Sequence, residues 1–270
     1  MNKKIGFIGC GNMGQAMIGG IVKSGITTPE NIIVSDMNEN FLASMKNKYN
    51  INTTTNNTEV ASFSDILILS VKPNIYEKVI KEIAPAVKEN VLIVTIAAGI
   101  SIDFVEKTFA KAIKVIRTMP NTPALVGEGM SALSKNDKVT EEELKEVISI
   151  FESFGKAEVI DERLMDSIPA ISGSSPAYVF MFIEALADGA VLRGMPRDKA
   201  YKFAAQAVLG SAKMVLETGE HPGALKDKVC SPGGTTIDAV YSLEKNNFRG
   251  AVISAMESCT KKAMEMSNRK

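Results

Sequence analysis

Three glycines near the start of the chain have the spacing of a phosphate-binding loop. Gly9, Gly11 and Gly14 form a G-x-G-x-x-G pattern directly after the apolar run Ile5–Ile8. In such a loop the first glycine permits a tight turn, the second lets a pyrophosphate approach the backbone, and the third lets a helix pack closely on a strand. Because a strand precedes and a helix follows, we prefer this interpretation to a glycine-rich turn without a ligand. The residues predicted to hold a dinucleotide here are Gly9, Cys10, Gly11, Asn12, Met13 and Gly14.

Asp36 ends the second apolar run of the chain, about 20 residues beyond the last of these glycines. An acidic residue at this place usually accepts a hydrogen bond from the adenosine ribose 2′-hydroxyl and favours NAD over NADP. The polar neighbours Ser35 and Asn38 would equally serve a 2′-phosphate, and Asp36 would also cap a helix that begins near Glu39. The fingerprint therefore leaves the choice between the two cofactors open.

Two further loops follow predicted strands, where open α/β sheets bind their ligands. They are Ser70-Val71-Lys72-Pro73 and Ala97-Ala98-Gly99. Lys72, just past a buried strand, is suited to a cofactor phosphate or ribose, although a solvated loop lysine would give the same pattern.

A second glycine-rich turn, Ser231–Thr236, lies far along the chain and directly before a predicted helix. Hydroxyl groups and uncrowded N–H groups at a helix start make an anion site suited to a carboxylate. An ordinary capped loop is the alternative. His221 is the only histidine, which excludes a zinc site built on two histidines, and we predict no metal site.

The elements that must position these loops differ between the two parts of the chain. Short apolar runs rich in Ile and Val alternate with amphipathic stretches, which predicts a parallel sheet covered by helices on both faces. The predicted strands are Ile5–Ile8, Ile32–Ser35, Asp65–Val71, Val91–Ile96, Ile113–Arg117 and Met130–Ser134. The helices predicted between and after them are Met13–Ser24, Glu39–Lys48, Tyr76–Val87, Asp103–Ala110 and one from Thr140 to about Phe154.

From about Arg163 onward the strand pattern stops and helices are predicted instead. These are Ala177–Leu192, Asp198–Glu217, Thr236–Lys245 and Arg249–Ser267. The first two are rich in alanine and glycine, which favours close helix packing within the chain or on a partner chain. We therefore predict a doubly wound α/β domain of the Rossmann type over residues 1–162 and an all-α domain over residues 163–270.

The composition excludes several classes of function. Lysine and arginine total 31 and aspartate and glutamate total 31, so the formal net charge is zero, and no basic field attracts nucleic acid or an anionic membrane. The cysteines number 3, an odd count that fits a reducing compartment. We expect a soluble, cytoplasmic protein that acts on a small molecule and binds neither nucleic acid nor membrane.

Several motifs taken together resemble the pyrroline-5-carboxylate reductase family over essentially the whole chain. The glycine fingerprint is shared with other reductases. The number of matching families is reduced by three further motifs, Val71-Lys72-Pro73, Ala97-Ala98-Gly99 and Met119–Pro123. The strongest match runs from His221-Pro222-Gly223 to the Ser231–Thr236 turn. The chain departs from the family at Ser175, which replaces a glycine, at Lys228, where some members carry asparagine, and at Asp36, which is atypical of members that prefer NADPH.

The resemblance implies reduction of 1-pyrroline-5-carboxylate to L-proline, the last step of proline biosynthesis, with NADP(H) or also NAD(H) as cofactor. It also implies a homodimer, formed through the helical half, that assembles further. The cofactor residues that it adds to the loop and to Asp36 are Ser35, Asn57, Ser70, Val71, Lys72 and Ala97. The substrate residues it implies are Glu162, Gly233, Gly234, Thr235 and Thr236.

Thr236 is the predicted catalytic residue, because the resemblance places its hydroxyl near the ring nitrogen of the substrate. A threonine hydroxyl is a weak acid, so we interpret it first as a positioning group. Two alternative functions are a β-hydroxyacid dehydrogenase, whose glycine-rich opening is nearly identical, and a non-catalytic dinucleotide sensor. The dehydrogenase is disfavoured because no lysine lies between Gly173 and Arg193. The sensor is disfavoured because the second polar turn, Ser231–Thr236, is present.

Overall fold

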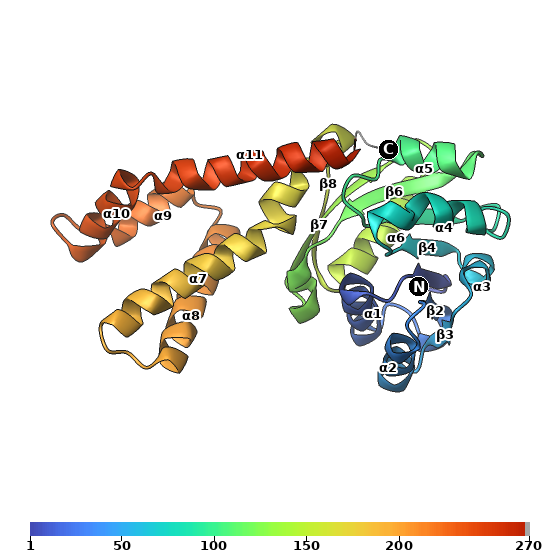
Figure 1. The fold of residues 1–270 in the computed structure, drawn as a ribbon, viewed down its shortest axis with the longest axis horizontal. Helices are drawn as coiled ribbons and strands as arrows, with labels where there is room; N and C mark the ends of the chain where they lie inside the picture. Colours follow the sequence, from blue (N-terminus) through green and yellow to red (C-terminus); the bar gives the residue numbers. More distant parts are fainter. Residues whose placement is uncertain (268–270) are drawn as a thin grey trace. The chain divides into compact units, whose positions relative to one another are not determined.

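The computed structural model describes residues 1–267, which form two compact units (Figure 1). Unit 1 comprises Met1–Ser174 and the C-terminal segment that begins at Cys259. Unit 2 comprises Ser175–Ser258.

Unit 1 is built on an 8-stranded sheet with the order β3-β2-β1-β4-β5-β6-β7-β8. The first six strands pair in parallel, β6 and β7 are antiparallel, and β7 and β8 are parallel to each other. The strand order reverses at β1, since the chain moves outward to β3 and then returns to place β4 on the other side. The strands are β1 Ile5–Ile8, β2 Ile32–Ser35, β3 Asn52–Thr54, β4 Ile66–Leu69, β5 Leu92–Thr95, β6 Lys114–Met119, β7 Gly129–Lys135 and β8 Gly155–Val159.

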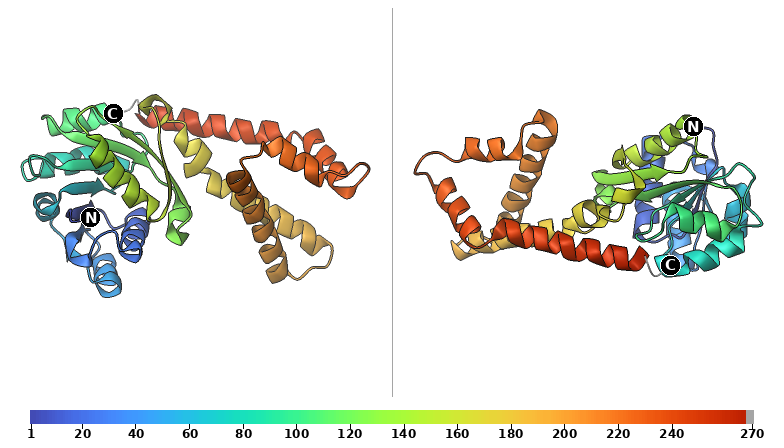
Figure 2. Two further views of the ribbon diagram at one scale, coloured as in Figure 1. Left: turned by 180° about the vertical axis from the view of Figure 1, so that it is seen from behind. Right: turned by 90° about the horizontal axis from the view of Figure 1, so that it is seen from above.

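Helices cover both faces of this sheet, as the two views of Figure 2 show. One apolar cluster joins one face to α1, α2 and α6, and a second joins the opposite face to α3, α4 and α5. The doubly wound α/β fold predicted from the sequence is therefore confirmed. The helices are α1 Asn12–Ser24, α2 Glu39–Tyr49, α3 Asn57–Phe63, α4 Tyr76–Ile83, α5 Ile102–Phe109 and α6 Glu141–Glu152.

The six predicted strands are all present, and the structure adds two that were not predicted, β3 and β8. Both lie at the edges of the sheet, and most of their residues are partly or fully exposed. An edge strand is not buried on both faces, so it lacks the continuous Ile- and Val-rich run that marks the central strands. The helices α3 and α9 were also missed because they are short, with 7 and 8 residues.

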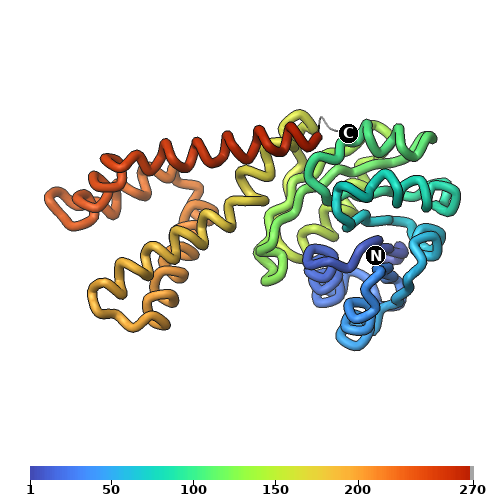
Figure 3. Tube along the Cα trace, in the orientation of Figure 1, coloured from blue at the N-terminus to red at the C-terminus, as the bar shows by residue number. Residues whose placement is uncertain are grey.

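Unit 2 is helical, as predicted. It contains α7 Ser175–Leu192, α8 Arg197–Thr218, α9 Pro222–Val229, α10 Thr235–Lys245 and the first part of α11 Phe248–Ser267. The helices α7 and α8 run next to each other, as the trace in Figure 3 shows. Their buried residues are the alanines Ala187, Ala200 and Ala204, so small side chains allow the two backbones to approach closely.

Large apolar side chains cover much of the surface of unit 2. On α7 and α8 they include Phe180, Met181 and Phe203, which are 64%, 69% and 68% exposed. Among the described residues, the segment Pro169–Leu192 is long and apolar enough to span a membrane by length and composition alone, which for a single helix is weak evidence. Large apolar side chains exposed in such number are typical of a protein–protein interface.

Candidate active site

The glycine-rich loop connects β1 to α1 and is held by close backbone packing. Gly9 has a φ of +104°, which L side chains rarely adopt, and a Cβ there would lie 2.6 Å from the carbonyl oxygen of Ser70. A Cβ on Gly14 would lie 2.7 Å from the carbonyl oxygen of Gly9. By contrast, a Cβ on Gly11 would meet nothing within 4 Å. Two glycines therefore allow tight packing, and the third leaves space beside the backbone.

The start of α1 is suited to an anion. Gly11 is the N-cap residue and provides no side-chain acceptor, and the first turn carries no acidic residue. The first intrahelical bond runs from the N–H of Gln15 to the carbonyl of Gly11, so the N–H groups before it have no acceptor inside the helix. Their partial positive charge and the open space at Gly11 fit a pyrophosphate.

Ser70, just beyond β4, is hydrogen-bonded to the glycine-rich loop. Its hydroxyl donates to the carbonyl oxygens of Ile8 at 3.1 Å and Gly9 at 2.7 Å. The strand order reverses between β1 and β4, which is where an open α/β sheet binds its ligand. Val71 and Lys72 follow in the same loop, and Lys72 is exposed at the start of the 3₁₀ turn Pro73–Ile75.

Asp36, just beyond β2, lies against the same loop. Its Oδ2 accepts a hydrogen bond from the backbone N–H of Cys10 at 2.6 Å, and its Oδ1 accepts from the N–H of Asn38 at 2.8 Å. The N-cap of α2 is Asn38, whose side chain accepts from Asn40, so Asp36 does not cap this helix. Burial, and to a smaller extent the Asp36 carboxylate, raise the pKa of the Cys10 thiol to about 11, which keeps the thiol protonated.

Ser35 and Asn57 are brought together beside Asp36. Ser35 is fully buried, and its hydroxyl donates to Oδ1 of Asn57 at 2.8 Å. The amide of Asn57 in turn donates to Oε2 of Glu82 at 3.3 Å. The predicted cofactor residues Ser35, Asp36 and Asn57 therefore lie together at the end of β2 and the start of α3.

Tyr76 joins the ends of β4 and β5 and was not predicted as a site residue. Its buried phenol donates to the carbonyl of Leu69 and accepts from the N–H of Ile96, and burial raises its pKa. Ala97, the predicted cofactor residue of this loop, is buried directly after Ile96. An isolated tyrosine at a helix start carries no pattern that would reveal this role.

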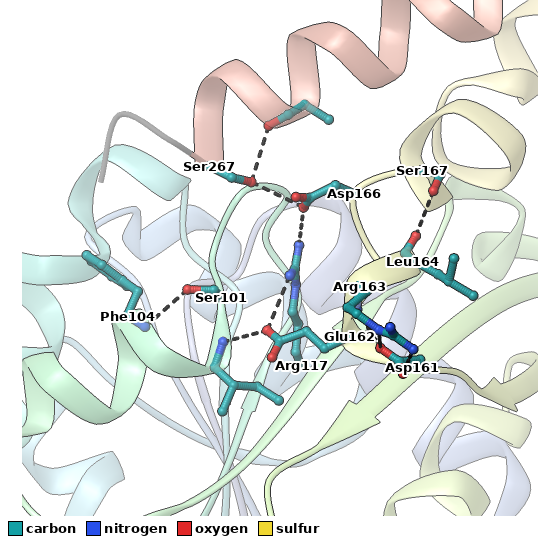
Figure 4. Close-up of polar contacts among 12 residues, drawn as sticks. Ser101, Phe104, Arg117, Asp161, Glu162, Arg163, Leu164, Asp166, Ser167 and Ser267 are labelled. Carbon is teal, nitrogen blue, oxygen red and sulfur yellow. Dashed lines mark hydrogen bonds and ion pairs between the residues drawn. The ribbon is translucent and has the colours of Figure 1, made fainter.

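Glu162 lies in a cluster of charged groups around Arg117 (Figure 4). The guanidinium of Arg117 contacts Glu162 Oε1 at 3.3 Å and Asp166 Oδ1 at 2.6 Å, and its side chain is only 7% exposed. Glu162 Oε1 also accepts from the N–H of Ile102 at 2.8 Å, and the Ser267 hydroxyl donates to Asp166 at 3.1 Å. Arg117 was not predicted as a site residue, although a charged residue within an apolar strand pattern was the available signal.

The second glycine-rich turn lies in unit 2 and begins α10. Gly233 has a φ of +66°, and Gly234 is the N-cap residue without a side-chain cap. Thr235 and Thr236 form the first turn of the helix. Glu162 and the predicted cofactor residues thus belong to unit 1, whereas Gly233–Thr236 belong to unit 2. Among residues 1–267, no group of three or more His, Cys, Asp or Glu side chains is placed to hold a metal ion.

Comparison with known proteins decides the family. A family model described as pyrroline-5-carboxylate reductase dimerisation matches residues 162–266, and one described as NADP oxidoreductase, coenzyme F420-dependent, matches residues 4–99. The pyrroline-5-carboxylate reductase of Escherichia coli (strain K12) is 54% identical over 267 residues, which cover 99% of both chains. The chain belongs to the pyrroline-5-carboxylate reductase family.

Solved structures of this family have the same fold. The pyrroline-5-carboxylate reductase of Coxiella burnetii is 34% identical with a TM-score of 0.92, and the match covers 99% of each chain. The enzyme of Plasmodium falciparum, solved with NADP bound, is 36% identical with a TM-score of 0.89 over 98% of each chain. The predicted family and fold class are both confirmed.

The side chain of Arg117 is buried in unit 1, which leads to a prediction about stability. Replacing Arg117 with methionine leaves Glu162 and Asp166 without their shared cation. Removing one member of a fully buried ion pair typically costs about 3–5 kcal/mol, but the side chains of Glu162 and Asp166 are 33% and 26% exposed, so water compensates part of the loss. We expect Arg117→Met to lower the free energy of unfolding by about 1–3 kcal/mol, and Asp166→Asn to lower it less, in denaturant titrations followed by circular dichroism.

Arg163, which directly follows Glu162 in the chain, provides a matched control. Its side chain is 87% exposed and paired with Asp161, and exposed ion pairs contribute little to stability. Arg163→Met should therefore leave the unfolding midpoint unchanged. Equal midpoints for Arg117→Met and Arg163→Met would show that the cluster does not stabilise unit 1.

Proposed function

We propose that the chain reduces 1-pyrroline-5-carboxylate to L-proline with a hydride from NAD(P)H, the last step of proline biosynthesis. The observation that carries this proposal is the full-length similarity to curated pyrroline-5-carboxylate reductases, 54% identical in Escherichia coli and 44% in Methanosarcina acetivorans. The glycine-rich loop and the position of Asp36 and Ser70 against it support a dinucleotide site in unit 1.

The residues of unit 1 fit a nicotinamide dinucleotide. The loop from Gly9 to Gly14 would bind the pyrophosphate through the N–H groups at the start of α1. At the adenosine ribose we place Ser35, Asp36 and Asn57. Along the rest of the cofactor we place Ser70, Val71, Lys72 and Ala97. When bound, the reduced cofactor supplies the hydride.

The reaction requires the protein mainly to bind the substrate and the cofactor and to orient them toward each other. A hydride adds to the imine carbon, the C=N π bond breaks toward nitrogen, and the protonated nitrogen becomes the secondary amine of proline. We assign the substrate carboxylate to the N–H groups and hydroxyls of the Gly233–Thr236 turn, with the Thr236 hydroxyl hydrogen-bonded to the ring nitrogen. Glu162 is the remaining residue proposed for the substrate.

We further propose that residues 1–162 form the dinucleotide-binding domain and residues 163–270 the substrate-binding and dimerisation domain. The match of the dimerisation model to residues 162–266 supports this, as do the exposed apolar side chains of α7 and α8. The homodimer would cover these side chains and associate into a larger homo-oligomer.

The reaction is tested by following the oxidation of NADPH and of NADH with purified protein and 1-pyrroline-5-carboxylate. We expect rapid oxidation that yields proline. A folded protein that binds a dinucleotide but oxidises neither cofactor would contradict the proposal. Turnover of hydroxyacids would then favour a β-hydroxyacid dehydrogenase, and no turnover at all would favour a dinucleotide sensor.

Thr236→Val removes the hydroxyl assigned to the ring nitrogen while keeping the side-chain shape. We expect kcat/KM to fall by roughly 10- to 100-fold, as for the loss of one hydrogen bond to a charged group, cofactor affinity to stay unchanged, and Thr236→Ser to restore most of the activity. Full kcat/KM in Thr236→Val would show that the hydroxyl has no role in the reaction.

Gly11→Val tests the pyrophosphate site. The backbone of Gly11 is extended, with φ of −70° and ψ of −176°, and a Cβ there meets nothing within 4 Å, so the variant should fold normally. Its side chain would occupy the space assigned to the pyrophosphate, and we expect calorimetric titration to show a loss of dinucleotide affinity of about 100-fold or more. Unchanged affinity would place the cofactor elsewhere.

The oligomeric state is tested by sedimentation equilibrium. We expect a mass of at least twice that of the chain, because the apolar side chains of α7 and α8 need a covering surface. Phe203→Asp, which places a charge on this surface, should shift the equilibrium toward smaller species, whereas the exposed Lys202→Asp should not. A monomeric wild-type protein would contradict the proposal.

A further inference from the structure

The carboxylate of Asp36 is fixed in one orientation at the adenosine side of the proposed cofactor site. Both of its oxygens accept backbone hydrogen bonds, one from Cys10 in the glycine-rich loop and one from Asn38 before α2. Because these donors belong to two separate segments, rotation of the side chain would break at least one bond. The negative charge therefore stays next to the loop.

The segment around Asp36 contains no cation of its own that would balance a phosphate. Residues 36–40 are Asp, Met, Asn, Glu and Asn, which include two carboxylates and no lysine or arginine. The basic residues of α2, Lys46 and Lys48, lie in its last turn. At 1.5 Å per residue they are roughly 10–14 Å farther along the helix than Glu39.

The neutral groups beside Asp36 are also engaged. The hydroxyl of the fully buried Ser35 donates to Asn57, and the amide of Asn57 donates to Glu82. A 2′-phosphate placed here would therefore lie next to the fixed carboxylate of Asp36. Asn57, the neighbouring amide, is itself hydrogen-bonded to a second carboxylate, that of Glu82. A ribose 2′-hydroxyl, in contrast, would find in Asp36 an acceptor for its hydrogen bond.

We propose that Asp36 sets the discrimination between NADPH and NADH in this chain: its carboxylate accepts a hydrogen bond from the ribose 2′-hydroxyl of NADH and repels the 2′-phosphate of NADPH. This inference deepens the proposed function, since it concerns the cofactor of the same site. NADP(H) still enters the site through its pyrophosphate, but it gains nothing from the additional phosphate. We therefore expect NADH to bind at least as tightly as NADPH.

The experiment measures binding without catalysis, by isothermal titration calorimetry of the full-length protein. The probes are NADPH and NADH, together with the fragments 2′,5′-ADP and 5′-AMP, which isolate the contribution of the 2′-phosphate. Asp36→Asn and Asp36→Ser remove the charge, and circular dichroism confirms that each variant is folded. Each substitution should shift the ratio of the two dissociation constants at least 10-fold toward NADPH, and the fragments should shift in parallel, as expected for two nearby like charges.

Glu39→Gln is the matched control, because it removes a carboxylate from the same segment, in the first turn of α2. Its effect on the ratio should be less than threefold. The proposal is overturned if the wild-type protein binds NADPH more tightly than NADH, if neither Asp36 variant shifts the ratio 10-fold, or if Glu39→Gln shifts it as much.

These outcomes separate the inference from the proposed function. If the protein shows the expected ratios of dissociation constants but does not reduce 1-pyrroline-5-carboxylate, the inference about Asp36 holds and the proposed function is wrong. If the protein reduces the substrate but substitutions of Asp36 do not change its cofactor preference, the proposed function holds and the inference is wrong.

Discussion

The close approach of backbone to backbone at the carboxyl ends of β1 and β4 is the constraint on which the cofactor site depends. Gly9 lies against the Ser70 carbonyl and Gly14 against the Gly9 carbonyl, at distances that leave no room for a Cβ. This packing places the start of α1 directly over the point where the strand order reverses. A side chain at either glycine would displace the helix, and with it the N–H groups suited to a pyrophosphate.

Two charged groups of unit 1 have well-defined partners. Arg117 lies between Glu162 and Asp166, and Asp36 between two backbone N–H groups. A charge removed from water is tolerated only when hydrogen bonds or an opposite charge compensate it. We therefore expect the Arg117 cluster to stabilise the fold, and we propose that the fixed Asp36 carboxylate influences which ligand the neighbouring space accepts.

Unit 2 differs from unit 1 in which side chains it buries. Its buried positions on α7 and α8 are alanines, and its large apolar side chains point outward. Two helices alone cannot bury such side chains, so their hydrophobic stabilisation must come from a further surface. This region matches the dimerisation model of the reductase family, so a second copy of the chain is the natural candidate to provide that surface.

The sequence by itself determined the features that depend on local pattern: the central strands through their continuous apolar runs, the long helices through their periodicity, and the loop through its glycine spacing. It did not reveal the edge strands β3 and β8, which lack such runs. Only the tertiary structure decided what Asp36 and Arg117 contact, because their partners lie 26, 45 and 49 residues away in the chain. Such contacts arise from strand order and register, which bring together side chains that no local pattern connects.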